Sequence, residues 1–89
     1  MPASNVTIIN RLGLHARAAA RFVQVAGGFS SSVTLTRGGK TVNGKSIMGV
    51  MMLAAAQGAE LTIETAGADA DAALEALVSL IADRFGEPS

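Results

Sequence analysis

The spacing of the apolar residues changes repeatedly along this chain, and these changes limit the folds that it can adopt. Four short segments place apolar side chains at every second position, which is typical of strands with one buried face. Their apolar members are Val6 and Ile8, Val33 and Leu35, Val42, and Leu61 and Ile63. Gly38 and Gly39 separate the second and third segments, which predicts a two-residue hairpin turn.

Three other segments space their apolar residues three or four positions apart, as in helices that bury one side. The first begins at Ala16, and its predicted apolar side is Ala16, Ala19, Ala20 and Val23. The second covers residues 47–56, with Ser46 as its N-cap and Gly58 as its stop. The third follows the predicted N-cap Asp69 and runs towards Gly86, with an apolar stripe of Ala70, Ala73, Leu74, Leu77 and Ile81.

The predicted order of elements is therefore βαββαβα. Such an order is typical of an α+β fold, an open-faced β-sandwich in which three helices cover one face of a four-stranded antiparallel sheet. With 89 residues, the chain has room for one domain, residues 1–89. We find no internal repeat, linker or low-complexity segment that would divide it.

Composition excludes several classes of protein. Seven basic and seven acidic residues give zero net charge and only 3% of the residues are aromatic, so we expect no nucleic-acid partner. The absence of cysteine excludes disulfides and thiolate metal sites. The first residues do not resemble a signal peptide, and no apolar run approaches the roughly 20 residues that span a bilayer. We therefore expect a cytoplasmic protein without membrane insertion.

The only histidine, His15, precedes the first helical segment in "LGLHARAAARF", residues 12–22. At a helix N-cap it would lie beside unpaired backbone amides and the positive end of the helix dipole, which together favour an anion. A neutral imidazole there could attack phosphorus, with the phosphoryl group over the amides of Ala16 and Arg17 and beside the Arg17 guanidinium. The alternative is a solvated capping residue without chemistry. One imidazole is too few ligands for zinc, and no serine, histidine and acid triad can be assembled.

The stretches "GLHARAAARF" and "VNGKSIMGVMMLAAAQGAELTIETAGAD" resemble the HPr family, the histidine-containing phosphocarriers of the bacterial phosphoenolpyruvate-dependent sugar phosphotransferase system. The resemblance covers nearly the whole chain. It implies a stoichiometric carrier rather than an enzyme: enzyme I phosphorylates His15, which passes the group to enzyme IIA components with help from Arg17. It also implies a monomer without metal or cofactor. We assign the phosphate to the tele nitrogen Nε2, although the family more often uses the pros nitrogen.

Ala18 departs from the family pattern, in which histidine, any residue and arginine are often followed by proline. Proline in the first turn of a helix fixes φ and removes an amide that would be unpaired. Alanine is a strong helix former, so we expect the first turn to persist with one more free amide.

Ser46 lies in "GKSIMGVMM" and has two compatible interpretations. It is a predicted N-cap, and it also matches the serine that an HPr kinase/phosphorylase modifies in members of the family. A phosphate at a helix N-terminus is stabilised locally, and its charge would repel acidic groups on a partner such as enzyme I.

The segment after Ser46 is apolar on nearly every side, which is more than a short surface helix can bury. If Val50, Leu53 and Ala54 face the sheet, then Ile47, Met48 and Met51 remain partly exposed. These residues either fill an irregular core or form a partner-binding patch with Arg17 and Arg21 as its basic rim, joined by Lys45.

Two other functions remain open at this point. A regulatory docking adaptor controlled by Ser46 phosphorylation would need no carrier turnover, but the presence of His15 argues against docking as the sole role. An anion-binding or nucleic-acid-binding module is disfavoured by the neutral charge. The sequence does not distinguish a sugar-transport branch from a nitrogen-related or purely regulatory one.

Overall fold

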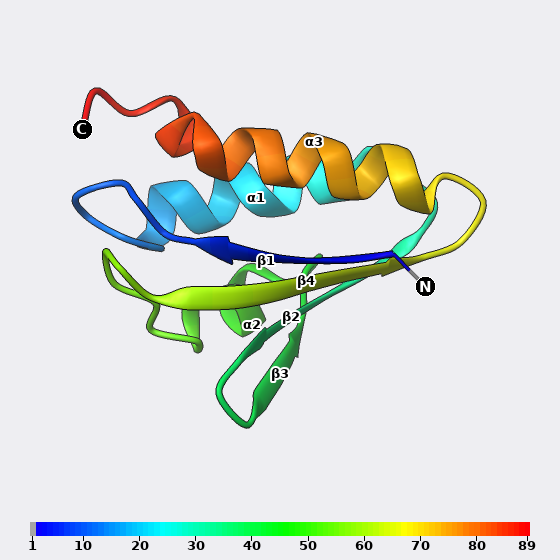
Figure 1. Ribbon diagram of the computed structural model, residues 1–89, viewed down its shortest axis with the longest axis horizontal. Coiled ribbons are helices and arrows are strands. Elements are labelled where there is room, and N and C mark those ends of the chain that lie inside the picture. Colours follow the sequence, from blue (N-terminus) through cyan, green and yellow to red (C-terminus); the bar gives the residue numbers. More distant parts are fainter. Residues whose placement is uncertain (1) are drawn as a thin grey trace.

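The structure, a computed structural model, describes residues 2–89 and contains one antiparallel sheet with the strand order β1-β4-β2-β3. The strands are β1 (Ala3–Thr7), β2 (Ser32–Arg37), β3 (Lys40–Asn43) and β4 (Glu60–Ala66). The helices are α1 (Ala16–Gly27), α2 (Ile47–Met51) and α3 (Ala70–Ala82), followed by the short 3₁₀ turn η1 (Arg84–Gly86). Helices α1 and α3 lie side by side over the sheet (Figure 1). The predicted α+β open-faced sandwich and its βαββαβα order are confirmed.

The hydrophobic core fills the space between the sheet and the helices. The alternation in β2 and β4 points Val33, Leu35, Leu61 and Ile63 into this core, where they are at most 2% exposed. The opposite face is polar: Thr62 donates to Asn5 at 2.8 Å across β4 and β1. Burying one large aliphatic side chain contributes about 1.5–3 kcal/mol, so this one-sided pattern fixes which face the helices cover.

The buried side of α1 agrees only in part with the predicted one: Ala19 is buried and Val23 packs, partly buried, against the core. Ala16 and Ala20 are exposed, whereas Ala18, Ala19, Phe22 and Ala26 are buried. The helix turns its largest apolar side chain, Phe22, into the core, and the alanines that share this side follow it. The periodicity predicts the helix correctly, and its apolar stripe is right at Ala19 and Val23 but wrong at Ala16 and Ala20.

Helix α2 ends at Met51, so the predicted extent to residue 56 is wrong. Ala54 takes a left-handed conformation with φ 50°, which the helix cannot continue through. Side chains from the β2–β3 hairpin satisfy the carbonyls beyond the helix: Arg37 donates to Leu53 O at 3.1 Å, and Lys40 donates to Met52 O at 3.0 Å.

The third helix also ends before the predicted limit, at Ala82, and its N-cap acts differently from the prediction. Asp69 makes no side-chain cap, because its carboxylate accepts from the amides of Ser30 and Ser31 at 2.9 Å each. These bonds connect the start of α3 to the start of β2. Within residues 2–89, no helix is both long and apolar enough to cross a membrane.

Candidate functional site

The loop between β1 and α1 fixes the position of His15. Gly13 has φ +68°, and a Cβ added there would lie 2.6 Å from the carbonyl oxygen of Ala55. This contact is possible only for glycine. The next residue, Leu14, is buried and donates its amide to the same Ala55 oxygen at 2.8 Å. The loop is therefore held against the segment that follows α2, and His15 comes next.

His15 occupies the N-cap position of α1, as the sequence predicts. Its backbone is extended and its carbonyl accepts from Ala19 N at 2.8 Å, but its side chain makes no capping bond. The amides of Ala16, Arg17 and Ala18 have no hydrogen-bond acceptor within residues 2–89. Three unpaired donors at the positive end of a 12-residue helix form a site for an anion. Ala18 is fully buried, and the helix begins as predicted at Ala16 without the family proline.

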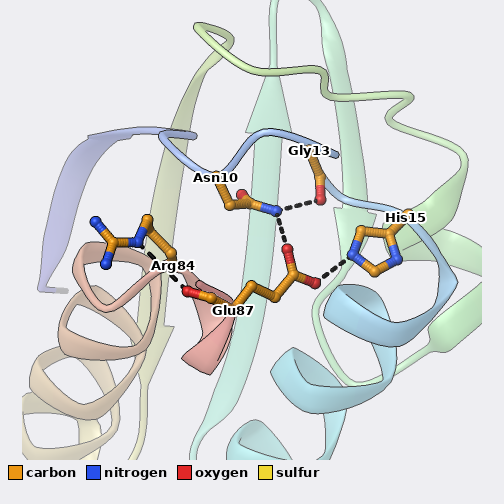
Figure 2. Close-up of polar contacts among 5 residues, drawn as sticks. All are labelled: Asn10, Gly13, His15, Arg84 and Glu87. Atoms are coloured by element: carbon orange, nitrogen blue, oxygen red, sulfur yellow. Dashed lines mark hydrogen bonds and ion pairs between the residues drawn. The ribbon is translucent and has the colours of Figure 1, made fainter. Parts of the chain in front are cut away.

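The imidazole of His15 contacts Glu87, a residue that the sequence analysis does not identify. His15 Nε2 bonds Glu87 Oε2, and Asn10 Nδ2 donates to Glu87 Oε1 at 2.9 Å and to Gly13 O at 2.8 Å (Figure 2). The side chains of His15 and Glu87 are 26% and 11% exposed. The carboxylate is therefore held on both oxygens in a largely covered position.

The charge state of Glu87 follows from these contacts. The hydrogen bond from Asn10 is the main factor that lowers the pKa of Glu87, while burial opposes it and the bond from His15 and the charges of His15 and Arg17 add to it. The carboxylate is thus ionised at neutral pH and can only accept hydrogen bonds. Nε2 of His15 must then carry the proton, which leaves Nδ1 with its lone pair. This contact disfavours Nε2, the nitrogen assigned from the sequence, as the phosphate acceptor.

The C-terminal turn brings Glu87 to the histidine. Arg84 and Phe85 both have φ 55° and Gly86 has φ 79°, so three consecutive residues are left-handed. Phe85 is buried at 1% exposure and anchors the turn in the core. The pairing of His15 with Glu87 spans 72 positions, and the sequence gives only one indication of it: an apolar Phe85 beyond the last helical stripe.

The arginines near the site differ in their surroundings. Arg17 is exposed and, with Arg11, Leu12 and residues 87–89, lines a pocket of about 180 Å³. Arg21 lies beside the C-terminal turn, where a Cβ added to Gly86 would come 3.0 Å from its Nη1. Lys45 donates to Phe29 O at 2.8 Å, beyond the opposite end of α1. It therefore does not join Arg17 in a basic rim.

Large apolar side chains are exposed on α2, directly after it and in the loop before His15. They are Ile47 (43% exposed), Met48 (72%), Met51 (40%) and Met52 (59%), and in the loop Ile9 (43%) and Leu12 (68%). The predicted exposure of Ile47, Met48 and Met51 is confirmed. Val50 and Leu53 face the core as predicted, but Ala54 is exposed and Ala55 is buried in its place.

Ser46 is the N-cap of α2. Its hydroxyl oxygen accepts from Gly49 N at 3.1 Å, as the capping pattern predicts. The residue is half-buried.

Within residues 2–89, no three histidine, cysteine, aspartate or glutamate side chains are grouped so that they could hold a metal ion.

Comparisons with known proteins identify the family of the chain. A family model described as "PTS HPr component phosphorylation site" matches residues 3–83. The chain is 58% identical to the phosphocarrier protein HPr of Cupriavidus necator, covering 93% of each, and 57% identical to that of Pseudomonas aeruginosa, covering 98% of each. It is also similar to the crystal structure of an HPr from Thermoanaerobacter tengcongensis, with a TM-score of 0.96 and 45% identity over the whole of both chains. The chain belongs to the HPr family, the phosphocarrier proteins of the phosphotransferase system.

Proposed function

We propose that His15 accepts a phosphoryl group from phosphorylated enzyme I and passes it to enzyme IIA components. One observation supports this most strongly: a half-buried imidazole stands at a helix start with three unpaired amides, and one of its two nitrogens is already held by a carboxylate. The phosphoryl oxygens would accept from the amides of Ala16 and Arg17, with the Arg17 guanidinium as a further donor. The chain carries the group and does not turn over by itself.

We assign the phosphate to Nδ1 rather than to Nε2. Nδ1 attacks phosphorus, the bond from phosphorus to the donor breaks, and the electron pair of that bond leaves with the donor. No proton has to leave Nε2 in this step, because Glu87 holds it throughout. The reverse attack by an enzyme IIA component would return the electron pair to Nδ1.

The partner surface that we propose consists of Ile47, Met48 and Met51 with Arg17 and Arg21. All five are exposed, and the segment after α2 is bonded to the loop before His15 through Leu14 and Ala55. Flexible methionines suit a surface that must bind several proteins in turn. An acidic partner would complement the two arginines.

We also propose Ser46 as a regulatory phosphorylation site for an HPr kinase/phosphorylase. Its hydroxyl uses only one acceptor position in the cap, and the exposed Ile47 and Met48 follow it directly. A phosphate there would add negative charge beside the partner surface and weaken docking of an acidic partner.

Phosphate transfer from phosphoenolpyruvate in the presence of enzyme I tests the carrier proposal. We expect wild-type chain to take up label that acid removes and alkali does not, and His15→Ala to take up none. Absence of label on folded wild-type chain would contradict the proposal and favour the docking adaptor controlled by Ser46. Light scattering during the same experiment tests the proposed monomer.

A further inference from the structure

The proposed carrier chemistry uses the contact between Glu87 and His15 but does not explain what holds Glu87 in place. Glu87 is 72 positions from His15, yet its two carboxylate oxygens have separate partners: Asn10 on Oε1 and His15 on Oε2 (Figure 2). Asn10 is fully buried, and its Nδ2 bonds two acceptors, Glu87 Oε1 and Gly13 O. The amide of Asn10 therefore has one favourable orientation, with its nitrogen towards Glu87.

The backbone around Glu87 is shaped for this contact. Two non-glycine residues in succession, Arg84 and Phe85, take left-handed conformations, each of which costs about 1 kcal/mol or more. Burial of Phe85 offsets this cost, and the amide of Glu87 donates to Arg84 O at 2.9 Å. The left-handed turn is anchored by buried Phe85 and leads directly to Glu87. It therefore places the Glu87 carboxylate at a defined position.

We propose that Asn10 and Glu87 form a positioning pair that sets the protonation state of the His15 ring. Ionised Glu87 keeps the proton on Nε2, so that Nδ1 is the nucleophile, and it stabilises the positive charge that the ring acquires when Nδ1 bonds phosphorus. Asn10 prevents the carboxylate from rotating away. This proposal rests on the proposed function, and it names the residues that decide which nitrogen reacts.

Substitution of Glu87 by glutamine gives the sharpest test, because Asn10 dictates the orientation of the new amide. Asn10 Nδ2 is a donor, so the carbonyl of the introduced glutamine must face Asn10, and its NH₂ group must face His15. A donor at this position requires a lone pair on Nε2 and moves the proton to Nδ1. The Glu87→Gln variant therefore keeps the size of the side chain but blocks the nucleophile.

The experiment measures the tautomer of His15 by ¹⁵N NMR under mildly alkaline conditions, in which an imidazole is neutral. We expect wild-type chain to be protonated at Nε2, Glu87→Ala to be a mixture, and Glu87→Gln to be protonated mainly at Nδ1. Phosphorylation by enzyme I should slow in the same order, by about tenfold or more in Glu87→Gln, which is the scale of losses when carboxylate partners of histidine ligands are removed. The loss should fall on kcat, with KM for the chain unchanged.

Glu75→Gln is the matched control, because Glu75 is exposed on α3 and its side chain makes no hydrogen bond among the described residues. It should keep the wild-type tautomer and rate. Retention of the Nε2 proton in Glu87→Gln would contradict the orienting role of Asn10, and wild-type tautomer and rate in Glu87→Ala as well would overturn the whole proposal. The tautomer is measured on the unphosphorylated chain, so this measurement does not depend on phosphate transfer. If the wild-type chain accepted no phosphate, that result would contradict the carrier function but not the positioning pair.

Discussion

Gly13 determines how closely the loop before His15 can approach the segment after α2. Its left-handed backbone and the 2.6 Å approach to Ala55 O act together, whereas Gly58 and Gly39 show one of these features or neither. Gly58 has φ +90° with no atom within 4 Å of an added Cβ, and Gly39 has neither a positive φ nor a neighbour. Alanine substitutions at these three positions therefore distinguish the cost of backbone strain from the cost of steric overlap.

We expect Gly13→Ala to lower the free energy of unfolding by at least about 2 kcal/mol, because strain and a backbone clash add. Gly58→Ala should cost about 1 kcal/mol from strain alone, and Gly39→Ala should stay within about 0.5 kcal/mol of wild type. Urea denaturation of the three variants measures the differences. Equal losses at Gly13 and Gly58 would show that the contact with Ala55 contributes nothing.

The sequence identifies part of the site at the residue scale. His15, Ala16 and Arg17 are contiguous, so the helix pattern that follows them is enough to place an imidazole beside free amides. Asn10 and Glu87 are not identifiable in this way, because their meeting depends on the left-handed turn at Arg84 and Phe85. Non-glycine residues rarely take that conformation, and no local pattern marks it.

At the scale of elements, Ser46 contributes to the stability of α2 through its cap. Ser46→Ala should cost about 1 kcal/mol, because the Gly49 amide loses its acceptor, and Ser46→Asp should lose less, since a carboxylate can also cap. Ser79→Ala, at an exposed position of α3, is the control and should be within about 0.5 kcal/mol of wild type. Equal effects at Ser46 and Ser79 in chemical denaturation would argue against the cap.

Asp69 connects α3 to β2 and makes this connection sensitive to acid. The hydroxyl of Ser31 is the main cause that lowers the pKa of Asp69 from 3.8 to about 2, with the Ser30 amide next. A carboxyl whose pKa is lower in the folded state stabilises fully above its unfolded value and loses this contribution as pH falls towards the folded value.

We therefore expect wild type to unfold at a higher temperature than Asp69→Asn at about pH 6, well above both pKa values of Asp69. The difference should shrink between about pH 4 and pH 2, as Asp69 becomes protonated. Thermal unfolding of both chains across this range measures it. A difference that does not depend on pH would mean that the carboxylate charge is not responsible.

Periodicity predicts which elements exist and their order, but not where helices end. The limit of α2 depends on Arg37 and Lys40, which are distant in sequence and bond the carbonyls after Met51. The buried side of α1 depends on Phe22, which outweighs the alanines that the spacing rule counts equally. Both errors arise because tertiary contacts decide among locally acceptable alternatives.

At the scale of the whole molecule, the net charge is zero, but two arginines and several exposed apolar side chains lie close to the elements that form the site. Arg17 and Arg21 lie on the first half of α1, near the C-terminal turn, and the exposed apolar residues surround α2. A partner that docks over the two arginines and over α2 would cover His15. The exposed apolar residues of α2 are not part of the core cluster, so packing of the fold does not explain them.

Met48→Lys tests this surface, because Met48 is 72% exposed and its replacement should not affect folding. We expect KM for the chain as substrate of enzyme I to rise about tenfold, with the thermal unfolding temperature unchanged. Ala72→Lys, at an exposed position near the start of α3, adds the same charge away from the site. Equal KM values for the two variants would contradict docking on α2.

Determination of the phosphorylated nitrogen by ³¹P and ¹⁵N NMR, after reaction with phosphoenolpyruvate and enzyme I, tests the central claim most directly. We predict one phosphoryl group, on Nδ1 of His15, with the proton still on Nε2 beside Glu87. Phosphate on Nε2, or no phosphate on folded chain, would contradict the claim that this chain carries a phosphoryl group on a histidine positioned by its own C-terminal turn.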